Sequence, residues 1–479
     1  MTISIKNINQ FSNLRGLERE SLRVLKDGTL SLTPHPISLG SKLKNNTFTV
    51  DFSEGHLEFI SKPVKSIDKM IDNMKAIASF AAKNISSKEI LLCSSMPLKV
   101  SEKEIKIADF GNSKEGALKR LYRQGLSTRY GKIMQIISGI HYNFSFCPKI
   151  IDEFCKNRKI NKEDLYFSVI HNYFEFMWLI PYFFGASPIC AKTSVKTKKD
   201  YLSSLNKDYY IGKYSTSLRL SEIGYKNLCE QNICVSYRNI TQYTKDIQSL
   251  TRKPFEPFKK LGIYNGGYRQ QINENILQTE SEFYDNIRPK QSKKGKKNDF
   301  KSFLQEGINY LEVRLFDINP FCEIGINEES SYFIEVILVT CLMFSEKYSE
   351  KKISRGRYNL KKVIEQGRNP QLNLLNNKDH KTLLSNLGHY LLDKLEYVAC
   401  EMGEKYHLSI KKQREVLECP EKTYSGMIVE KVRSIEYPDW IINQSNFMTS
   451  RLKNFKISSK KNDELNSDIT NSILQDKYY

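Results

Sequence analysis

The segment RGLERES, residues 15–21, holds the pattern on which the fold depends. Alternate side chains of a β-strand point to the same face, so Glu18 and Glu20 are predicted to share one face of a sheet. A Glu-x-Glu pair by itself is more often a solvated strand face than a functional site. The segment therefore predicts a strand, and its meaning depends on whether other strands repeat the pattern.

Four other segments predict strands with one apolar row and one polar row. They are TFTVDF at 47–52, HLEF at 56–59, residues 136–146 and YLEVRL at 310–315. Their polar rows contain Asp51, Glu58, His141, Asn143, Glu312 and Arg314. Phe52 falls in the apolar row with Phe48 and Val50. Half-exposed strands alternate as well, so the repetition of the pattern, more than any one segment, favours a shared polar site.

Convergence of these polar rows would gather five carboxylates and one imidazole, from Glu18, Glu20, Asp51, Glu58, Glu312 and His141. Carboxylates at such close range would become protonated unless cations bind between them. Oxygen ligands with one imidazole suit Mg²⁺ or Mn²⁺, and several such ions beside an arginine suit phosphoryl transfer. From the residues alone, Arg314 is better explained as an ordinary ion partner for a strand glutamate.

The chain has 479 residues and a formal net charge of +20, from 74 Lys and Arg against 54 Asp and Glu. This excess indicates either an anionic partner or a generally lysine-rich surface. A nucleic-acid-binding surface should interleave basic and aromatic residues. The lysines are scattered instead, and the densest run, KQSKKGKK at 290–297, contains no aromatic residue. Because this run combines Ser, Gly and Lys without periodicity, it is predicted to be an exposed loop. Nucleic-acid binding is therefore the weaker hypothesis.

Composition also restricts the class of protein. With 40% hydrophobic and 27% charged residues, the chain is typical of a globular protein and excludes a disordered or fibrous one. The longest apolar run, residues 336–344, is less than half of the ~20 residues that a membrane-spanning helix needs. Ten cysteines without a Cys-x-x-Cys pair indicate reduced thiols of a cytoplasmic protein and argue against a cysteine-based zinc site.

Helices are predicted by apolar spacings of three and four residues. Residues 66–84 predict a helix with Ser66 as its N-cap, and residues 164–180 predict a buried helix that Pro181 ends. Residues 330–412 are mainly helical in pattern. The expected organisation is one catalytic domain over 1–455, sheet-rich in 13–321 and helical in 330–455, followed by a loosely ordered polar tail at 456–479.

Several long strings now resemble a known family. They are GLERESLRV, FTVDFSEGHLEFIS, LYRQGLSTRYGKIMQIISGIHYNFS, YSTSLRLSEIGY, EFYDNIRPK and INYLEVRLFDINPF. In order and spacing they resemble the proteobacterial type of glutamate–cysteine ligase (γ-glutamylcysteine synthetase). The resemblance runs from Asn13 to Phe321 and continues more weakly through EQGRNP to about Arg451. The lysine-rich stretch between Pro289 and Phe303 has no counterpart in it.

The resemblance implies an α+β fold related to glutamine synthetase, in which an antiparallel sheet curls into a funnel with helices packed outside. It implies ATP-dependent ligation of the glutamate γ-carboxyl to the cysteine amine through γ-glutamyl phosphate, the first step of glutathione biosynthesis. A related ligase that uses another amine is the alternative. Small-molecule substrates, Mg²⁺ or Mn²⁺, a cytoplasmic monomer, and no nucleic-acid or membrane partner are expected.

The resemblance also implies roles for individual residues. Metal ligands would be Glu18, Glu20, Asp51, Glu58, His141 and Glu312. Arg314 would stabilise the transferred phosphate and act in catalysis with Glu312. The cysteine pocket would consist of Phe52, Tyr122, Leu126, Gln135, Tyr225 and Tyr284. Arg219 would bind an amino-acid carboxylate, and Asn143 would lie near the glutamate. No redox role of the cysteines is implied, and His56 is more simply explained as a packed or exposed imidazole.

Overall fold

The computed structural model describes residues 12–224, 235–291, 300–344 and 346–477. Its main element is a seven-stranded sheet in which every pair of strands is antiparallel. The strand order is β11-β12-β5-β1-β3-β2, and β4 pairs with the far end of β1. The bounds are β1 (Leu14–Leu25), β2 (Phe48–Val50), β3 (His56–Ile60), β4 (Glu89–Leu91), β5 (Ile140–Ser145), β11 (Ile287–Lys290) and β12 (Tyr310–Phe316). The strand that contains RGLERES is therefore central.

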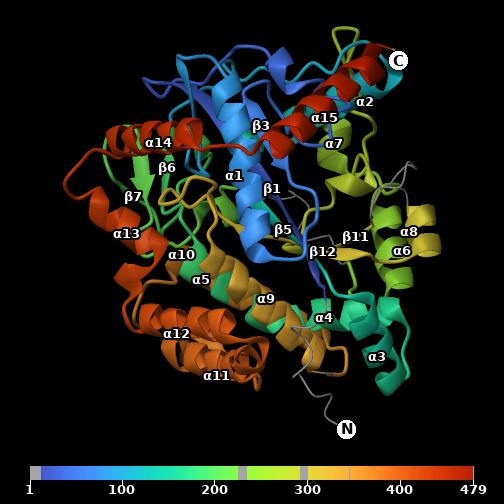
Figure 1. Ribbon diagram of the computed structural model, residues 1–479, viewed down its shortest axis with the longest axis vertical. Coiled ribbons are helices and arrows are strands. Elements are labelled where there is room, and N and C mark those ends of the chain that lie inside the picture. Colours follow the sequence, from blue (N-terminus) through green and yellow to red (C-terminus); the bar gives the residue numbers. More distant parts are fainter. Residues whose placement is uncertain (1–11, 225–234, 292–299, 345, 478–479) are drawn as a thin grey trace.

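Helices surround this sheet, so the predicted α+β class is confirmed (Figure 1). The first eight are α1 (Ile67–Asn84), α2 (Lys114–Tyr130), α3 (Pro148–Arg158), α4 (Lys162–Phe176), α5 (Leu179–Phe184), α6 (Ile240–Leu250), α7 (Glu256–Leu261) and α8 (Phe300–Glu306). The others are α9 (Glu328–Met343), α10 (Glu350–Gln366), α11 (Leu384–Met402), α12 (Glu404–Glu418), α13 (Tyr424–Lys431), α14 (Tyr437–Asn454) and α15 (Ser459–Lys477). No helix in the described ranges is both long and apolar enough to cross a membrane.

The remaining strands form small separate sheets. They are β6 (Ile189–Ala191), β7 (Ser203–Ser204) and β8 (Tyr209–Ile211), the hairpin β9 (Tyr264–Asn265) and β10 (Tyr268–Arg269), and the hairpin β13 (Asn373–Leu375) and β14 (Lys381–Leu383). The last hairpin interrupts the mainly helical region predicted for residues 330–412, which is otherwise built from α9 to α12.

The two faces of the main sheet differ as the alternation predicts. The apolar rows, including Leu57, Phe144, Leu311 and Val313, are fully buried. Helix α1 packs on β1 and β3, and α5 packs on β12. The predicted start of α1 is confirmed, because the Ser66 side chain accepts a hydrogen bond from the Lys69 main-chain N–H. The polar rows are left on the opposite face, where the candidate site lies.

Residues 164–180 do not form the single helix that the pattern predicted. Helix α4 ends at Phe176, and α5 begins at Leu179 and contains Pro181 in its first turn. The first turn of a helix has no intrahelical partner for its N–H groups, so a proline is tolerated there. Pro181 thus lies near the start of the second helix, whereas the pattern predicted that it would end the first.

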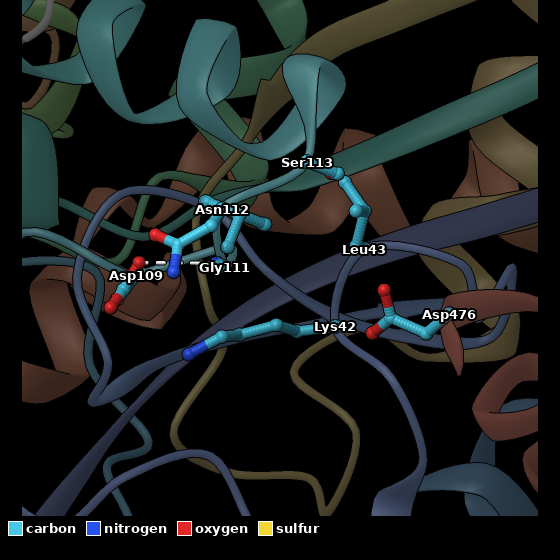
Figure 2. Close-up of a pocket in the computed structure, with 8 residues that line it drawn as sticks. Lys42, Leu43, Asp109, Gly111, Asn112, Ser113 and Asp476 are labelled. Atoms are coloured by element: carbon cyan, nitrogen blue, oxygen red, sulfur yellow. Dashed lines mark hydrogen bonds between the residues drawn. The ribbon is translucent and has the colours of Figure 1, made fainter. Parts of the chain in front are cut away.

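The expectation of a loosely ordered tail at 456–479 is wrong, because residues 459–477 form α15. Leu465 and Ile469, one helical turn apart, are buried against the rest of the protein. The Ser41 hydroxyl donates to Asp476 Oδ2 at 2.6 Å, and Lys62 lies 2.7 Å from Glu464 Oε1. Asp476 also lines a surface pocket of about 570 Å³ with Lys42 and residues 109–113 (Figure 2). Four apolar side chains, Leu465, Ile469, Ile473 and Leu474, in an otherwise polar sequence gave too weak a periodic signal to predict this helix.

We expect Leu465→Ala to lower the free energy of unfolding by about 2–3 kcal/mol, because it leaves a cavity beneath α15. Chemical denaturation followed by circular dichroism measures the change. Leu474→Ala is the matched control, since Leu474 lies on the same helix but is 46% exposed. Equal effects of the two variants would show that α15 does not pack as described.

Candidate active site

The centre of the polar face brings together Glu18, His141 and Glu312, from three adjacent strands. Glu18 on β1 pairs directly with His141 on β5, and Glu312 on β12 pairs with Asn143, two residues further along β5. One possible ligand atom from each of the three lies within 4.8 Å of the others. His141 Nδ1 is 3.1 Å from Glu18 Oε2 and 3.7 Å from Glu312 Oε1. The three side chains could therefore ligate one cation.

A second group of carboxylates, Glu20, Asp51 and Glu58, lies beside the first. Glu20 pairs with Glu58 across β1 and β3, and Asp51 follows directly after β2. The other ring nitrogen of the imidazole, His141 Nε2, is 4.0 Å from Glu20 Oε1. His141 thus stands between the two groups, with one nitrogen toward each.

Proton affinities differ across this cluster. Burial, together with the charges of Glu18, Asp51 and Glu20, raises the pKa of Glu58 well above its usual range. Burial also acts to raise the pKa of Glu312, but Lys290 and Arg314 outweigh it and hold that pKa well below the usual range. The Glu58 side therefore has an excess of negative charge that a divalent cation would relieve, which fits carboxylate-bound Mg²⁺ or Mn²⁺.

Two cations flank Glu312. Lys290 Nζ lies 3.1 Å from its Oε1 and Arg314 Nη1 lies 3.1 Å from its Oε2. The Arg314 guanidinium also lies over the Tyr284 ring, 4.8 Å from the centroid. Lys290 was predicted to open an exposed lysine-rich loop, but it is the last residue of β11 and points to the cluster. Residues 292–297, the rest of that predicted loop, lie outside the described residues.

A pocket of about 240 Å³ adjoins the carboxylates. Ten of the residues predicted for the site line it: Glu20, Asp51, Phe52, Tyr122, Leu126, Gln135, His141, Arg219, Tyr284 and Arg314. Asn143 does not line it, and its side-chain N–H₂ donates to Glu18 Oε1 at 2.9 Å instead. Tyr225 lies outside the described residues. The pocket therefore places apolar, aromatic and cationic groups beside the carboxylates.

The position of Phe52 corrects the strand pattern. β2 ends at Val50, so alternation no longer determines which way Phe52 points. Its side chain is buried and lines the pocket. Asp51, in the same turn, lies 3.7 Å from His56 Nδ1, and His56 Nε2 is 2.9 Å from the Ser138 hydroxyl. His56 is fully buried, so of the two expected alternatives, a packed or an exposed imidazole, the structure shows the packed one.

Sequence reasoning missed two arginines that line the pocket, Arg123 and Arg288. Arg123 follows Tyr122 on α2 and donates through Nε to the Asp51 main-chain oxygen. Arg288 on β11 pairs with Glu312, and its buried Nε has no hydrogen-bond partner within the described part of the chain. Both lie inside the strings quoted above, but an arginine beside a tyrosine, or at a strand edge, is usually a surface residue.

Arg219 is fixed by a buried carboxylate. Asp317 accepts hydrogen bonds from the Ala186 main-chain N–H at 2.8 Å and from the hydroxyls of Ser187 and Ser217 at 2.7 and 2.9 Å. Its Oδ1 is 3.7 Å from Arg219 Nη1. Arg219 Nη2 in turn donates to the main-chain oxygen of Arg314 at 3.1 Å. Arg219 and Arg314, two of the four arginines that line the pocket, are thereby tied together.

A family model and the sequences of known proteins identify the same enzyme family. The family model described as glutamate-cysteine ligase matches residues 5–363. The glutamate–cysteine ligase of Wigglesworthia glossinidia brevipalpis is 38% identical over 437 residues, which cover 88% of this chain and 86% of the relative. That of Proteus mirabilis is 37% identical over 436 residues, with 88% and 82% covered.

Two solved structures are also similar. The crystal structure of glutamate–cysteine ligase from Francisella tularensis in complex with AMP has a TM-score of 0.95 and 43% identity, and the match covers 98% of this chain and 94% of that one. A bifunctional glutathione synthetase from Pasteurella multocida shares the fold, with a TM-score of 0.77 at 24% identity, over 94% of this chain and 54% of that one.

Proposed function

The chain belongs to the glutamate–cysteine ligase family, and from this membership we propose how its pocket forms γ-glutamylcysteine from glutamate, cysteine and ATP. The enzyme is a ligase of glutathione biosynthesis. The observation that carries the proposal is the junction of a carboxylate cluster with a pocket lined by four arginines: Arg123, Arg219, Arg288 and Arg314. Such a junction suits a reaction between anionic substrates and a nucleotide phosphate.

We propose that Glu18, His141 and Glu312 hold one divalent ion, and that Glu20, Asp51 and Glu58 contribute to a second region of binding. The short distances in the first trio and the raised pKa of Glu58 in the second support this. Mg²⁺ is the expected ion, and Mn²⁺ suits the same ligands. When bound, such ions supply positive charge that stabilises phosphoryl oxygens.

The chemistry has two steps. A γ-carboxylate oxygen of glutamate attacks the γ-phosphorus of ATP, the bond to the bridging oxygen breaks, and ADP leaves. The cysteine amine then attacks the acyl carbon of γ-glutamyl phosphate, phosphate departs, and the amine loses a proton. Arg314 is the group that we propose to stabilise the transferred phosphoryl oxygens, because its planar guanidinium is held by Glu312 and the Tyr284 ring at the pocket wall.

The other pocket residues suit the amino acids. Phe52 and Leu126 offer an apolar wall for a thiol-bearing side chain, and the hydroxyls of Tyr122 and Tyr284 can bind a carboxylate. Arg219 is proposed to bind an amino-acid carboxylate, and Gln135 offers a buried side-chain amide. Asn143 acts in this proposal through Glu18, whose carboxylate it orients. AMP in the Francisella structure supports a nucleotide subsite in the same fold.

The same proposal covers the shape of the sheet, the domain organisation, and the location and oligomeric state of the protein. We propose that the sheet forms the wall of a funnel, as in the glutamine synthetase fold, because polar residues from β1, β5 and β12 face one pocket. Residues 1–455 are proposed as a single catalytic domain, on which α15 packs. A cytoplasmic monomer is proposed, and the eight described cysteines, all free thiols, are consistent with a reducing compartment.

We expect the purified protein to release ADP rapidly only when glutamate, cysteine and a divalent metal are all present. A coupled ADP assay with mass spectrometry of γ-glutamylcysteine measures this. Parallel reactions with 2-aminobutyrate and alanine identify the preferred amine, and a clear preference for either would favour a related ligase. No γ-glutamyl product with any amine would refute the proposed function.

A further inference from the structure

The segment between the short helix at Met134–Ile136 and β5 contains Gly139, which lies against two parts of the site. Its main-chain N–H donates to Glu20 Oε2 at 2.7 Å, and its main-chain oxygen accepts from the Glu20 N–H at 3.1 Å. Glu20 is in the second carboxylate group. Gly139 therefore fixes both the main chain and the side chain of a proposed metal ligand.

The other side of Gly139 lies against Arg219. A methyl group at the Gly139 Cβ position would overlap Nη2, Cζ and Nε of the Arg219 guanidinium. These three atoms of the planar guanidinium lie at similar distances from the Gly139 Cβ position. The guanidinium therefore packs with its flat face against the glycine. No side chain fits between them unless the guanidinium moves, because the Gly139 main chain is held by Glu20 and by its place at the start of β5.

The position of the Arg219 guanidinium determines which groups its N–H donors can reach. Arg219 Nη2 is used by the Arg314 main-chain oxygen, while Nη1 is buried and has no hydrogen-bond partner in the described ranges. Asp317 Oδ1, 3.7 Å from Nη1, is beyond hydrogen-bonding distance and accepts from the Ser217 hydroxyl, while Oδ2 accepts from the Ala186 N–H and the Ser187 hydroxyl. Arg219 lines the pocket, so its guanidinium can meet a substrate carboxylate there.

We propose that Gly139 is a positioning residue for substrate binding: its missing side chain lets the Arg219 guanidinium lie flat on the main chain at the pocket wall, where it can meet an amino-acid carboxylate. Because the same residue holds Glu20, it also fixes the distance between the carboxylate subsite and the metal-binding carboxylates. This inference rests on the proposed function, which supplies the amino-acid substrates.

The test is Gly139→Ala. We expect the KM of one amino-acid substrate, glutamate or cysteine, to rise about 10- to 100-fold, the effect of losing one charge-assisted hydrogen bond. The melting temperature and the Mn²⁺ affinity, measured by electron paramagnetic resonance, should stay near those of the unsubstituted protein, because the Gly139 N–H still reaches Glu20. Gly16→Ala is the matched control: it lies on β1 in the same sheet, and its Cβ would meet Ser61 O at an ordinary 3.4 Å.

A double-mutant cycle separates positioning from a general structural role. In an Arg219→Ala background there is no guanidinium to displace, so we expect Gly139→Ala to add less than twofold to the KM of that substrate. A folded Gly139→Ala variant with unchanged KM values, or an equal effect in both backgrounds, would overturn the inference. Both results require an unsubstituted protein that makes γ-glutamylcysteine, so they are distinct from failure of the proposed function.

Discussion

Glu312→Gln is expected to lower kcat on the order of 10³-fold or more while the protein remains folded. Glu312 Oε1 and Oε2 each meet a cation, and Glu312 belongs to the trio of possible metal ligands with Glu18 and His141. The amide keeps the shape but removes the charge that holds a divalent ion and Arg314 together. Steady-state ADP release, Mn²⁺ titration and far-ultraviolet circular dichroism measure activity, metal affinity and fold on one sample.

Glu222→Gln is the matched control for this variant. Glu222 is a partly exposed carboxylate that forms ion pairs with Lys199 and Lys361, and it does not belong to the buried carboxylate cluster. Its conversion to an amide should leave kcat and Mn²⁺ affinity unchanged. Full activity of Glu312→Gln would mean that the polar faces of β5 and β12 do not form the catalytic centre.

Glu335→Gln is expected to lower the free energy of unfolding by about 3–5 kcal/mol, the usual cost of breaking a buried ion pair. Glu335 on α9 is fully buried and accepts four hydrogen bonds. Oε1 receives Arg15 Nε at 2.6 Å and the Tyr142 hydroxyl at 2.7 Å. Oε2 receives Arg15 Nη2 and the Tyr406 hydroxyl, both at 2.9 Å. An amide N–H₂ at either oxygen position would face two donors, and the Arg15 charge would lose its partner.

Urea denaturation of Glu335→Gln measures this loss. Glu222→Gln again serves as the control and should change stability by less than about 1 kcal/mol, because its ion pairs are partly exposed. A Glu335→Gln variant as stable as the control would show that Arg15 finds another partner in the folded protein.

The sequence predicted the polar strands well, because alternation reports burial directly. Leu57, Phe144 and Leu311 had to be buried, and their neighbours in the chain had to face the other way. Convergence of those neighbours was not predictable from the pattern, since strand order depends on contacts between distant segments. The family resemblance supplied it, and the observed pairing of Glu18 with His141 agrees.

The mistaken expectations share a cause. The end of β2 at Val50, the place of Lys290 within β11 and the break between α4 and α5 are all element boundaries, which depend on tertiary contacts more than on local pattern. Lys290 opens a run of lysines without periodicity, so its position in a strand could not be predicted from the local sequence. Its function depends on Glu312 in the adjacent strand, and no local signal in the sequence indicates that contact.

The docking of α15 has a consequence for how the protein acquires its activity. Ser41 and Asp476 are hydrogen-bonded across 435 residues of chain, and Arg15 and Glu335 across 320. Contacts of such long range form late and slowly, because the loop they close is entropically costly. During synthesis, β1 emerges before its partner strand β5 and before α9, whose Glu335 binds Arg15, and α15, which packs on α1, comes later still. The site should therefore not be complete until these later segments have been made, and shorter nascent chains should depend on protection from aggregation.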